Sequence, residues 1–253
     1  MKSIFKTLAL TSTLALASAG SQAALITINF STAANAEANF KSSLTSYVTE
    51  TFDSLGTAPG SIGAGDQNNW ENKAPSFVTS VGTFTMVTPG QNAAAGNPSN
   101  GDLMIESKNT GEFGRQVLSD GDADGSKDLW LDSNDAKLVT WTLGAPLTGS
   151  FNAFGFYISD ATDQGATLTL KFTNGTSAQV VLPAFSTNGN VGYVTVSSDV
   201  GVVGGVLDFI NSNGNDGWGI DDVTVGRVPE PSTLLLMGLG LLGLGAARRR
   251  NAA

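Results

Sequence analysis

Apolar and polar residues alternate with period two along much of the chain after residue 80. The segment Ala166–Thr173 (ATLTLKFT) places Ala, Leu, Leu and Phe on one side and Thr, Thr, Lys and Thr on the other. This pattern is typical of a strand in a sheet with one buried face. Asn174-Gly175 follows at once and is typical of a hairpin turn, so the next apolar segment should return beside the first. The same reasoning predicts strands at Val81–Val87, Leu138–Leu143, Phe151–Ser159, Gly192–Ser198, Gly205–Asn211 and Trp218–Gly226.

One segment has helical spacing instead. Ala36–Tyr47 places Phe40, Leu44 and Tyr47 at i, i+4 and i+7, which predicts a short amphipathic helix. Residues 56–72 and 89–102 are rich in Gly, Asn and Pro and are predicted as long loops. Many short strands, Gly/Asn turns and so little helix favour an all-β fold, an antiparallel β-sandwich or jelly roll. We expect a single such domain over residues 24–226.

Residues 1–23 have the order of features of a signal peptide. Lys2 and Lys6 precede an apolar stretch, and small residues at positions 21 and 23 complete the expected order. Cleavage by signal peptidase would fall between Ala23 and Ala24. A buried N-terminal helix is the alternative interpretation.

The C-terminal residues form a second terminal segment. Leu234–Ala247 is an apolar run of 14 residues, predicted as a hydrophobic helix, whereas a membrane-spanning helix needs about 20. Three arginines follow it, and positive residues stay on the cytoplasmic side of a membrane. The body of the chain would therefore face outward, away from the cytoplasm.

The order of motifs at this end carries a resemblance to a known family. Pro229-Glu230-Pro231, the apolar segment and then Arg248, Arg249 and Arg250 resemble the PEP-CTERM sorting signal of Gram-negative bacteria, over residues 228–253. The resemblance implies recognition by exosortase in the inner membrane, cleavage near the Pro-Glu-Pro motif, and release from or attachment to the cell surface. Hosts of this system make exopolysaccharide and biofilm. The same region is also labelled an ice-binding protein C-terminal domain.

A second resemblance concerns the body of the chain. The run from Trp130 to Gly226 resembles the β-sandwich ectodomains common in PEP-CTERM proteins. This resemblance implies the fold and leaves the activity open.

Composition excludes several classes of function. The chain has no Cys and no His, which removes disulfides, thiol nucleophiles, zinc sites built on these residues, and Ser-His-Asp catalysis. Its net charge is −9. Between Ala24 and Gly226 we count 7 Lys and Arg against 21 Asp and Glu. Nucleic acid is not expected as a partner, because phosphate binding needs a basic face.

An Asp-rich segment raises the question of calcium. Asp120, Asp122 and Asp124, followed by Gly, fit the first half of an EF-hand loop, and Asp128 stands at its ninth position. The twelfth position is Leu instead of Glu, and Asp132 comes one residue later. An EF-hand helix pair is therefore excluded. A Ca²⁺ loop on a β scaffold, formed by these five carboxylates, and a hydrated turn are both left open.

Two further pairs of carboxylates are candidate sites. Asp160 and Asp163 follow a predicted strand, where Asp commonly serves a turn. Asp221 and Asp222 lie within a predicted strand, so one of them should point inward or to a sheet edge, and an inward carboxylate would need a hydrogen-bond partner or a metal.

Three functions from different classes remain. An exported, non-catalytic binding or structural module for exopolysaccharide is expected, with Trp70, in a predicted loop, and Trp130 as candidate sugar-stacking residues. Trp141 alternates with apolar neighbours and is expected in the core. A glycoside hydrolase would need two paired carboxylates, and the available ones are Glu50, Glu71, Glu106 and Glu112. Ice binding or adhesion through a Thr-rich face, built from segments such as ATLTLKFT and TFTMVT, is the third.

Overall fold

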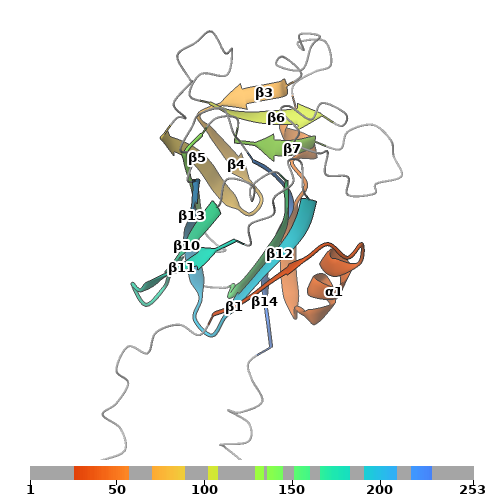
Figure 1. Ribbon diagram of the computed structural model, residues 1–253, viewed down its shortest axis with the longest axis vertical. Helices are drawn as coiled ribbons and strands as arrows, with labels where there is room; N and C mark the ends of the chain where they lie inside the picture. Colours follow the sequence, from red (N-terminus) through yellow and green to blue (C-terminus); the bar gives the residue numbers. More distant parts are fainter. Residues whose placement is uncertain are drawn as a thin grey trace, which may run out of the picture.

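The computed structural model describes residues 26–56, 70–88, 102–107, 129–133, 136–144, 151–159, 166–182, 191–209 and 218–229. Within these residues, strands form two antiparallel sheets that pack face to face, with one α-helix on the outside (Figure 1). The predicted all-β sandwich with a short N-terminal helix is confirmed for this part of the chain. The two terminal segments, residues 1–25 and 230–253, lie outside the described residues.

The larger sheet has eight strands. Its order is β1-β12-β9-β14-β7-β6-β3, and β2 pairs with β14. Its strands are β1 (Ile26–Ser31), β2 (Ser46–Glu50), β3 (Trp70–Ala74), β6 (Leu103–Ser107), β7 (Leu129–Asp132), β9 (Ala153–Ser159), β12 (Val191–Ser198) and β14 (Gly219–Arg227).

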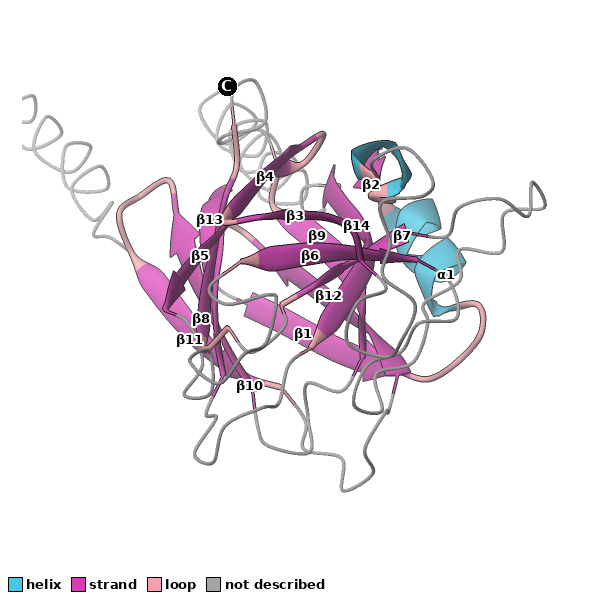
Figure 2. Ribbon diagram, turned by 90° about the horizontal axis from the view of Figure 1, so that it is seen from above, coloured by secondary structure: helices cyan, strands magenta, loops and turns pink. Residues whose placement is uncertain are grey.

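The smaller sheet has six strands in the order β11-β10-β13-β8-β5-β4. Its strands are β4 (Ser76–Thr79), β5 (Gly82–Thr88), β8 (Leu138–Thr142), β10 (Ala166–Phe172), β11 (Ser177–Val181) and β13 (Val202–Phe209). The predicted hairpin at Asn174-Gly175 joins β10 to β11, and Gly175 has a φ of 79°, a conformation that suits glycine. Figure 2 shows the two sheets from above, enclosing the core between them.

Aromatic rings from both sheets fill the core. Trp141 of β8 stacks on Phe84 of β5 with ring centroids 5.9 Å apart, and meets Phe154 of the opposite sheet edge-on at 5.4 Å. The indole N–H of Trp141 donates a hydrogen bond to the carbonyl of Val81, so its polar atom is satisfied. The expectation that Trp141 belongs to the core is confirmed, since it is 5% exposed.

Strand β14 changes its pairing partner near its two aspartates, Asp221 and Asp222. Gly219 and Ile220 pair with β7 on one side, whereas residues 223–227 pair with β2, and the register to β9 shifts between Asp221 and Thr224. Asp222 has a φ of 49°, which marks a bulge in the strand. Both aspartates are 2% exposed, and the Asp222 backbone N–H donates to Asp221 Oδ1 at 2.7 Å. Both carboxylates of the pair are therefore buried, whereas the sequence led us to expect one.

Two local expectations were wrong, and six strands were not predicted. The helix α1 spans Ala36–Ser43 and does not reach Tyr47, because Leu44 is extended and β2 begins at Ser46 to pair with β14. Trp70 lies in β3, opposite Glu106 of β6, and not in a loop. The alternation did not predict strands β1, β2, β3, β4, β6 and β7, each of which is only four to six residues long.

Candidate functional site

Helix α1 packs on the outer face of the eight-stranded sheet, on the far side of the molecule from β10 and β11 (Figure 1). Phe40 is its buried residue, and it lies against Ala153 of β9 and Tyr193 of β12. Gly155 makes room for this contact. A Cβ at Gly155 would lie 2.7 Å from the Tyr193 hydroxyl and 2.8 Å from the Phe40 ring. The close packing of α1 on the sheet therefore requires glycine at position 155, because a larger residue there would leave no room for Phe40 and Tyr193.

Two tyrosines complete the surface of the sheet on which α1 packs, which we call the helix seat. Tyr157 of β9 meets Tyr193 edge-on, with ring centroids 4.7 Å apart. Burial, followed by the negative charge of Glu37 on α1, raises the pKa of Tyr157 to about 12. The same two causes raise the pKa of Tyr193. Both phenols are therefore uncharged at neutral pH. Glu37 also forms an ion pair with Lys41, one turn along the helix.

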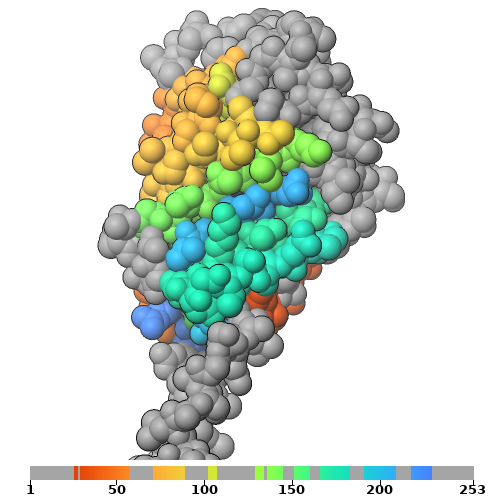
Figure 3. Space-filling model, turned by 90° about the vertical axis from the view of Figure 1, so that its left-hand side faces the viewer, coloured from red at the N-terminus to blue at the C-terminus, as the bar shows by residue number. Residues whose placement is uncertain are grey.

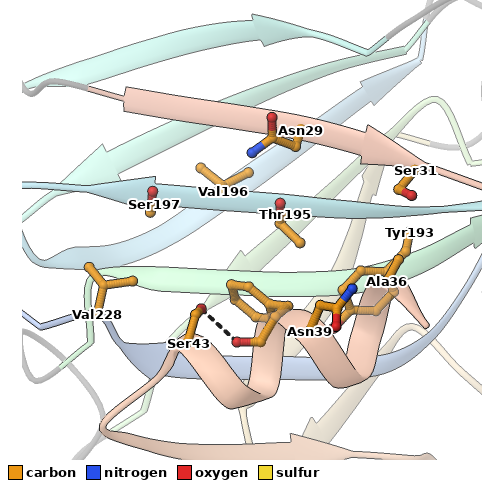
Figure 4. A pocket seen from close by; sticks show the side chains of 11 residues that line it. Asn29, Ser31, Ala36, Asn39, Ser43, Tyr193, Thr195, Val196, Ser197 and Val228 are labelled. Carbon is orange, nitrogen blue, oxygen red and sulfur yellow. Dashed lines mark hydrogen bonds between the residues drawn. The ribbon is translucent and has the colours of Figure 1, made fainter. Parts of the chain in front are cut away.

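Beside the helix a groove opens with a volume of about 350 Å³ (Figure 4). Its walls are α1 on one side and the outward residues of β1 and β12 on the other, and most of the side chains carry an amide or a hydroxyl group. The lining residues are Asn29, Ser31, Ala36, Asn39, Phe40, Ser43, Tyr193, Thr195, Val196, Ser197 and Val228. None of them is charged.

Several of these polar side chains form no hydrogen bond with another described residue. Within the described part of the chain, the side chains of Asn29, Asn39, Thr195 and Ser197 make no hydrogen bond. The Ser43 hydroxyl donates instead to the Phe40 carbonyl at 2.7 Å, the bond drawn in Figure 4. Four side chains with free hydrogen-bonding capacity thus converge on one concave, uncharged site.

The groove adjoins the point where the chain leaves the sandwich. Val228 lines one end of the groove, and its backbone N–H donates to Asn152 Oδ1 at 3.0 Å. The Arg227 carbonyl accepts hydrogen bonds from the backbone N–H and the hydroxyl of Thr45, which follows α1. The C-terminal segment therefore departs from beside the groove, and Pro229, the first residue of the Pro-Glu-Pro motif, is exposed.

The candidate calcium residues are placed only in part. Asp120, Asp122, Asp124 and Asp128 lie outside the described residues. Asp132 ends strand β7 and is fully buried, so it does not belong to a solvated turn. In the described ranges, no group of three or more Asp or Glu residues is arranged to hold a metal ion. Asp160 and Asp163 also lie outside the described residues.

The tryptophans differ from expectation. Trp130 lies in β7 with 0% of its surface exposed, so it cannot offer a ring face to a sugar in this structure. The reason is a tertiary contact. The Trp130 ring occupies the space beside Gly219 of the neighbouring strand, within 2.4 Å of where a Cβ would stand. The description of Trp70 covers its backbone alone, so its expected role in stacking stays a prediction.

Three of the four candidate glutamates for hydrolysis are described, and none of these three lines the groove. The carboxylate of Glu50 accepts the backbone N–H of Phe52 at 2.9 Å and that of Ser80 at 2.7 Å, which makes it a structural group. Glu71 and Glu106 belong to the neighbouring strands β3 and β6 and are buried. Glu112 lies outside the described residues.

Sequence reasoning did not identify the groove residues. Asn29, Asn39 and Thr195 come from three elements separated by up to 166 positions, and no local motif joins them. The one available signal was the alternation Tyr193-Thr195-Ser197, which places three polar-tipped side chains on the outer face of β12.

Similarity to solved structures is weak. A family 29 carbohydrate binding module shares 10% identity, with a TM-score of 0.29, and the match covers 50% of this chain and 92% of that one. A family 11 carbohydrate-binding module of a Clostridium thermocellum cellulase shares 7%, with a TM-score of 0.26, covering 42% and 79%. The CBM51-2 and INT domains of Clostridium perfringens ZmpB share 12%, with a TM-score of 0.30, covering 64% and 30%. At these scores the likeness carries no argument about the ligand of this chain.

The C-terminal segment gives a more specific result. No curated protein matches the sequence. No helix within the described ranges has the length and apolar character needed to cross a membrane. Residues 227–250, however, match the family model of the PEP-CTERM protein-sorting motif. This chain carries a PEP-CTERM protein-sorting motif, which implies export, a membrane-anchored intermediate processed by exosortase, and a final place at the cell surface.

Proposed function

We propose that the exported sandwich is a non-catalytic binding module of the cell surface or matrix, and that it binds neutral exopolysaccharide in the groove beside α1. The observation that supports this most directly is the set of uncommitted amide and hydroxyl side chains on the groove wall. Sugar hydroxyls both donate and accept hydrogen bonds, and so do the side chains of Asn, Ser and Thr. The volume of about 350 Å³ suits one or two sugar units, since ligand sites span about 300–1,000 Å³.

The charge of the protein favours a neutral ligand. The groove lining has no charged side chain, and the chain as a whole carries a net charge of −9. An acidic polysaccharide would be repelled by this field and would find no Lys or Arg in the lining to pair with. A neutral glycan avoids both costs.

The groove supports binding by hydrogen bonds more than by stacking. Phe40 is 8% exposed and Tyr193 is 1% exposed, so neither ring presents an open face. Trp70 remains the candidate for a stacking contact. Each hydrogen bond contributes about 0.5–1.5 kcal/mol, so four of them predict a weak site whose strength on a polymer comes from repeated contacts.

Binding is favoured over cleavage by the position of the carboxylates. Hydrolysis of a glycosidic bond requires two carboxyl groups about 5 to 9.5 Å apart across the sugar. The groove lining includes no Asp or Glu. Glu50 already accepts two backbone hydrogen bonds, so it is not available as an acid or base.

The test is affinity electrophoresis of the full chain in gels that contain a neutral polysaccharide from the host's own matrix. Asn29→Ala with Thr195→Ala removes two groove side chains, and we expect the dissociation constant to rise roughly 10-fold. Thr27→Ala is the matched control, because Thr27 is exposed on the same face of β1 but does not line the groove. Equal retardation of the double variant and the control would refute binding in the groove.

A further inference from the structure

The outer face of the six-stranded sheet is a second surface with an unusual composition. Figure 3 shows the molecule from the side of this sheet. Cross-strand pairing aligns the outward side chains of the sheet in three rows, and most of them are Thr, Ser or Val. We name this the threonine face. Its central row is Ser76, Thr85, Thr140, Val206, Thr169 and Gln179, its second row is Val78, Thr83, Thr142, Gly204, Lys171 and Ser177, and its third row is Leu138, Asp208, Thr167 and Val181.

The threonine face is nearly free of charge and carries two strongly exposed apolar side chains. Val78 is 74% exposed and Val181 is 75% exposed, and both belong to the four most exposed large apolar residues in the described ranges. Lys171 and Asp208 are the charged residues of the three rows, and neither forms an ion pair with another described residue. The chain has 22 acidic residues against 13 basic ones, yet this face is neutral. Two copies would repel one another least when they meet here.

The chemistry of the face argues against several other occupants. It has no aromatic side chain among its rows, which disfavours stacking on sugar rings. One lysine does not suffice for nucleic acid or an anionic membrane. Adjacent strands of a sheet twist by about 20–25°, so six strands do not match a flat crystal plane such as that of ice. Twisted sheets do pack on one another, at about −30°.

The two charges are placed so that a second copy would pair them. Lys171 lies opposite Gly204, and Asp208 lies four residues further along β13, which is about 13 Å. The pair Thr169 and Val206 stands midway between them. A two-fold axis in the plane of the face, along the central row, would bring Lys171 of one copy over Thr167 of the other. Asp208 of that copy lies on the adjacent strand, about 4.8 Å to the side and within reach of the long lysine side chain. Val206 would then face its own counterpart.

We propose that the threonine face is a self-association surface on which a second copy of this chain binds through such a two-fold axis. Outward residues are about 6.7 Å apart along a strand and strands are about 4.8 Å apart, so each of the sixteen row positions covers about 32 Å² of the face. The contact area is then about 500 Å² per copy and about 1,000 Å² in total, which is the lower limit of a specific interface. The dimer is therefore weak, and it forms at the high local concentration of a cell surface. It would bring two α1 grooves into one assembly, because α1 lies on the opposite sheet of each sandwich (Figure 1).

The test uses the absence of cysteine from the chain. In the full chain, Val206→Cys introduces a single thiol at the proposed axis, and Thr27→Cys places one on the exposed face of the other sheet as a control. A short bismaleimide should cross-link the Val206 variant at least about ten times faster than the control, because only the first brings two thiols together. Equal rates would overturn the proposal.

A charge exchange in the Val206→Cys background distinguishes this dimer from other associations. Lys171→Glu alone, or Asp208→Lys alone, turns both ion pairs into repulsions and should slow the cross-linking about 10-fold. The combination of the two restores attraction and should restore the rate. Association through the C-terminal segment, or on a shared polysaccharide or ice surface, would leave the rate insensitive to these charges and would also overturn the proposal. Because neither residue lines the groove, glycan binding is measured separately in the same variants.

Discussion

Substitution of Gly155 by Ala provides a direct test of how α1 is held on the sheet. The added methyl group would lie 2.7 Å from the Tyr193 hydroxyl and 2.8 Å from the Phe40 ring. Contacts this short require the helix or the tyrosine to move, and such overpacking costs about 1–3 kcal/mol. With a urea m-value of about 2–3 kcal/mol/M, a cost of about 2 kcal/mol lowers the unfolding midpoint by about 0.7–1 M. Gly144→Ala is the control, since a Cβ there meets nothing within 4 Å.

A double-mutant cycle identifies what the methyl group displaces. Phe40→Ala alone should cost about 3 kcal/mol, because it removes a buried aromatic side chain. In that background Gly155→Ala should cost at least about 1 kcal/mol less than in the original chain. The assay is urea unfolding of the full chain, followed by the fluorescence of its Trp residues, three of which are buried at 0–5% exposure. If Gly155→Ala costs the same with and without the Phe40 ring, the account of the helix seat is wrong.

Three other predictions concern separate parts of the molecule. Glu50→Ala leaves two backbone N–H groups without their acceptor and should destabilise the fold by about 2–4 kcal/mol in the same urea assay, whereas an unchanged midpoint would contradict the structural role. Because the pKa of Tyr157 is raised to about 12 in the folded chain, its stabilising contribution is complete below its ordinary pKa of 10.0 and is lost as the pH rises toward 12. Tyr157→Phe should remove part of that alkaline loss in unfolding measured between pH 9 and 12, and an identical pH dependence in the variant would refute the assignment. If the Asp-rich segment binds calcium with a Kd near 10⁻⁴ M, about 10 mM CaCl₂ against EDTA should stabilise the protein by about 2.7 kcal/mol and raise Tm by roughly 5–10 °C. Asp122→Asn with Asp124→Asn should abolish the shift, and the lack of any shift in the original chain would make the segment a hydrated turn.

The sequence alone determined the fold class and revealed the sorting motif that implies export. Alternation of apolar and polar residues is a local property, and it predicted the long strands such as Ala166–Phe172 and the hairpin after it. The sorting motif is a linear segment, read by its order of residues, so it too was visible without a structure. The absence of Cys and His excluded whole classes of chemistry from composition alone.

Pairing between strands determined where the short strands form and where helix α1 ends. Strands of four to six residues carry too few alternations to stand out, and β2 exists as a strand because β14 offers it a partner. The same pairing ends α1 at Ser43, where the periodicity would have continued it. Long-range hydrogen bonds between strands overrode local preference in both cases.

The candidate sites depended entirely on tertiary structure. Trp130 stood beside a polar segment in sequence, but Gly219 of a distant strand supplies the space that buries its ring. Asn29, Asn39 and Thr195 form one groove because a helix packs across two strands, and Lys171 and Asp208 share one face because register aligns β10 with β13. Periodicity fixes which side of a strand a residue occupies. Only the pairing of strands fixes which residues from elsewhere in the chain stand beside it.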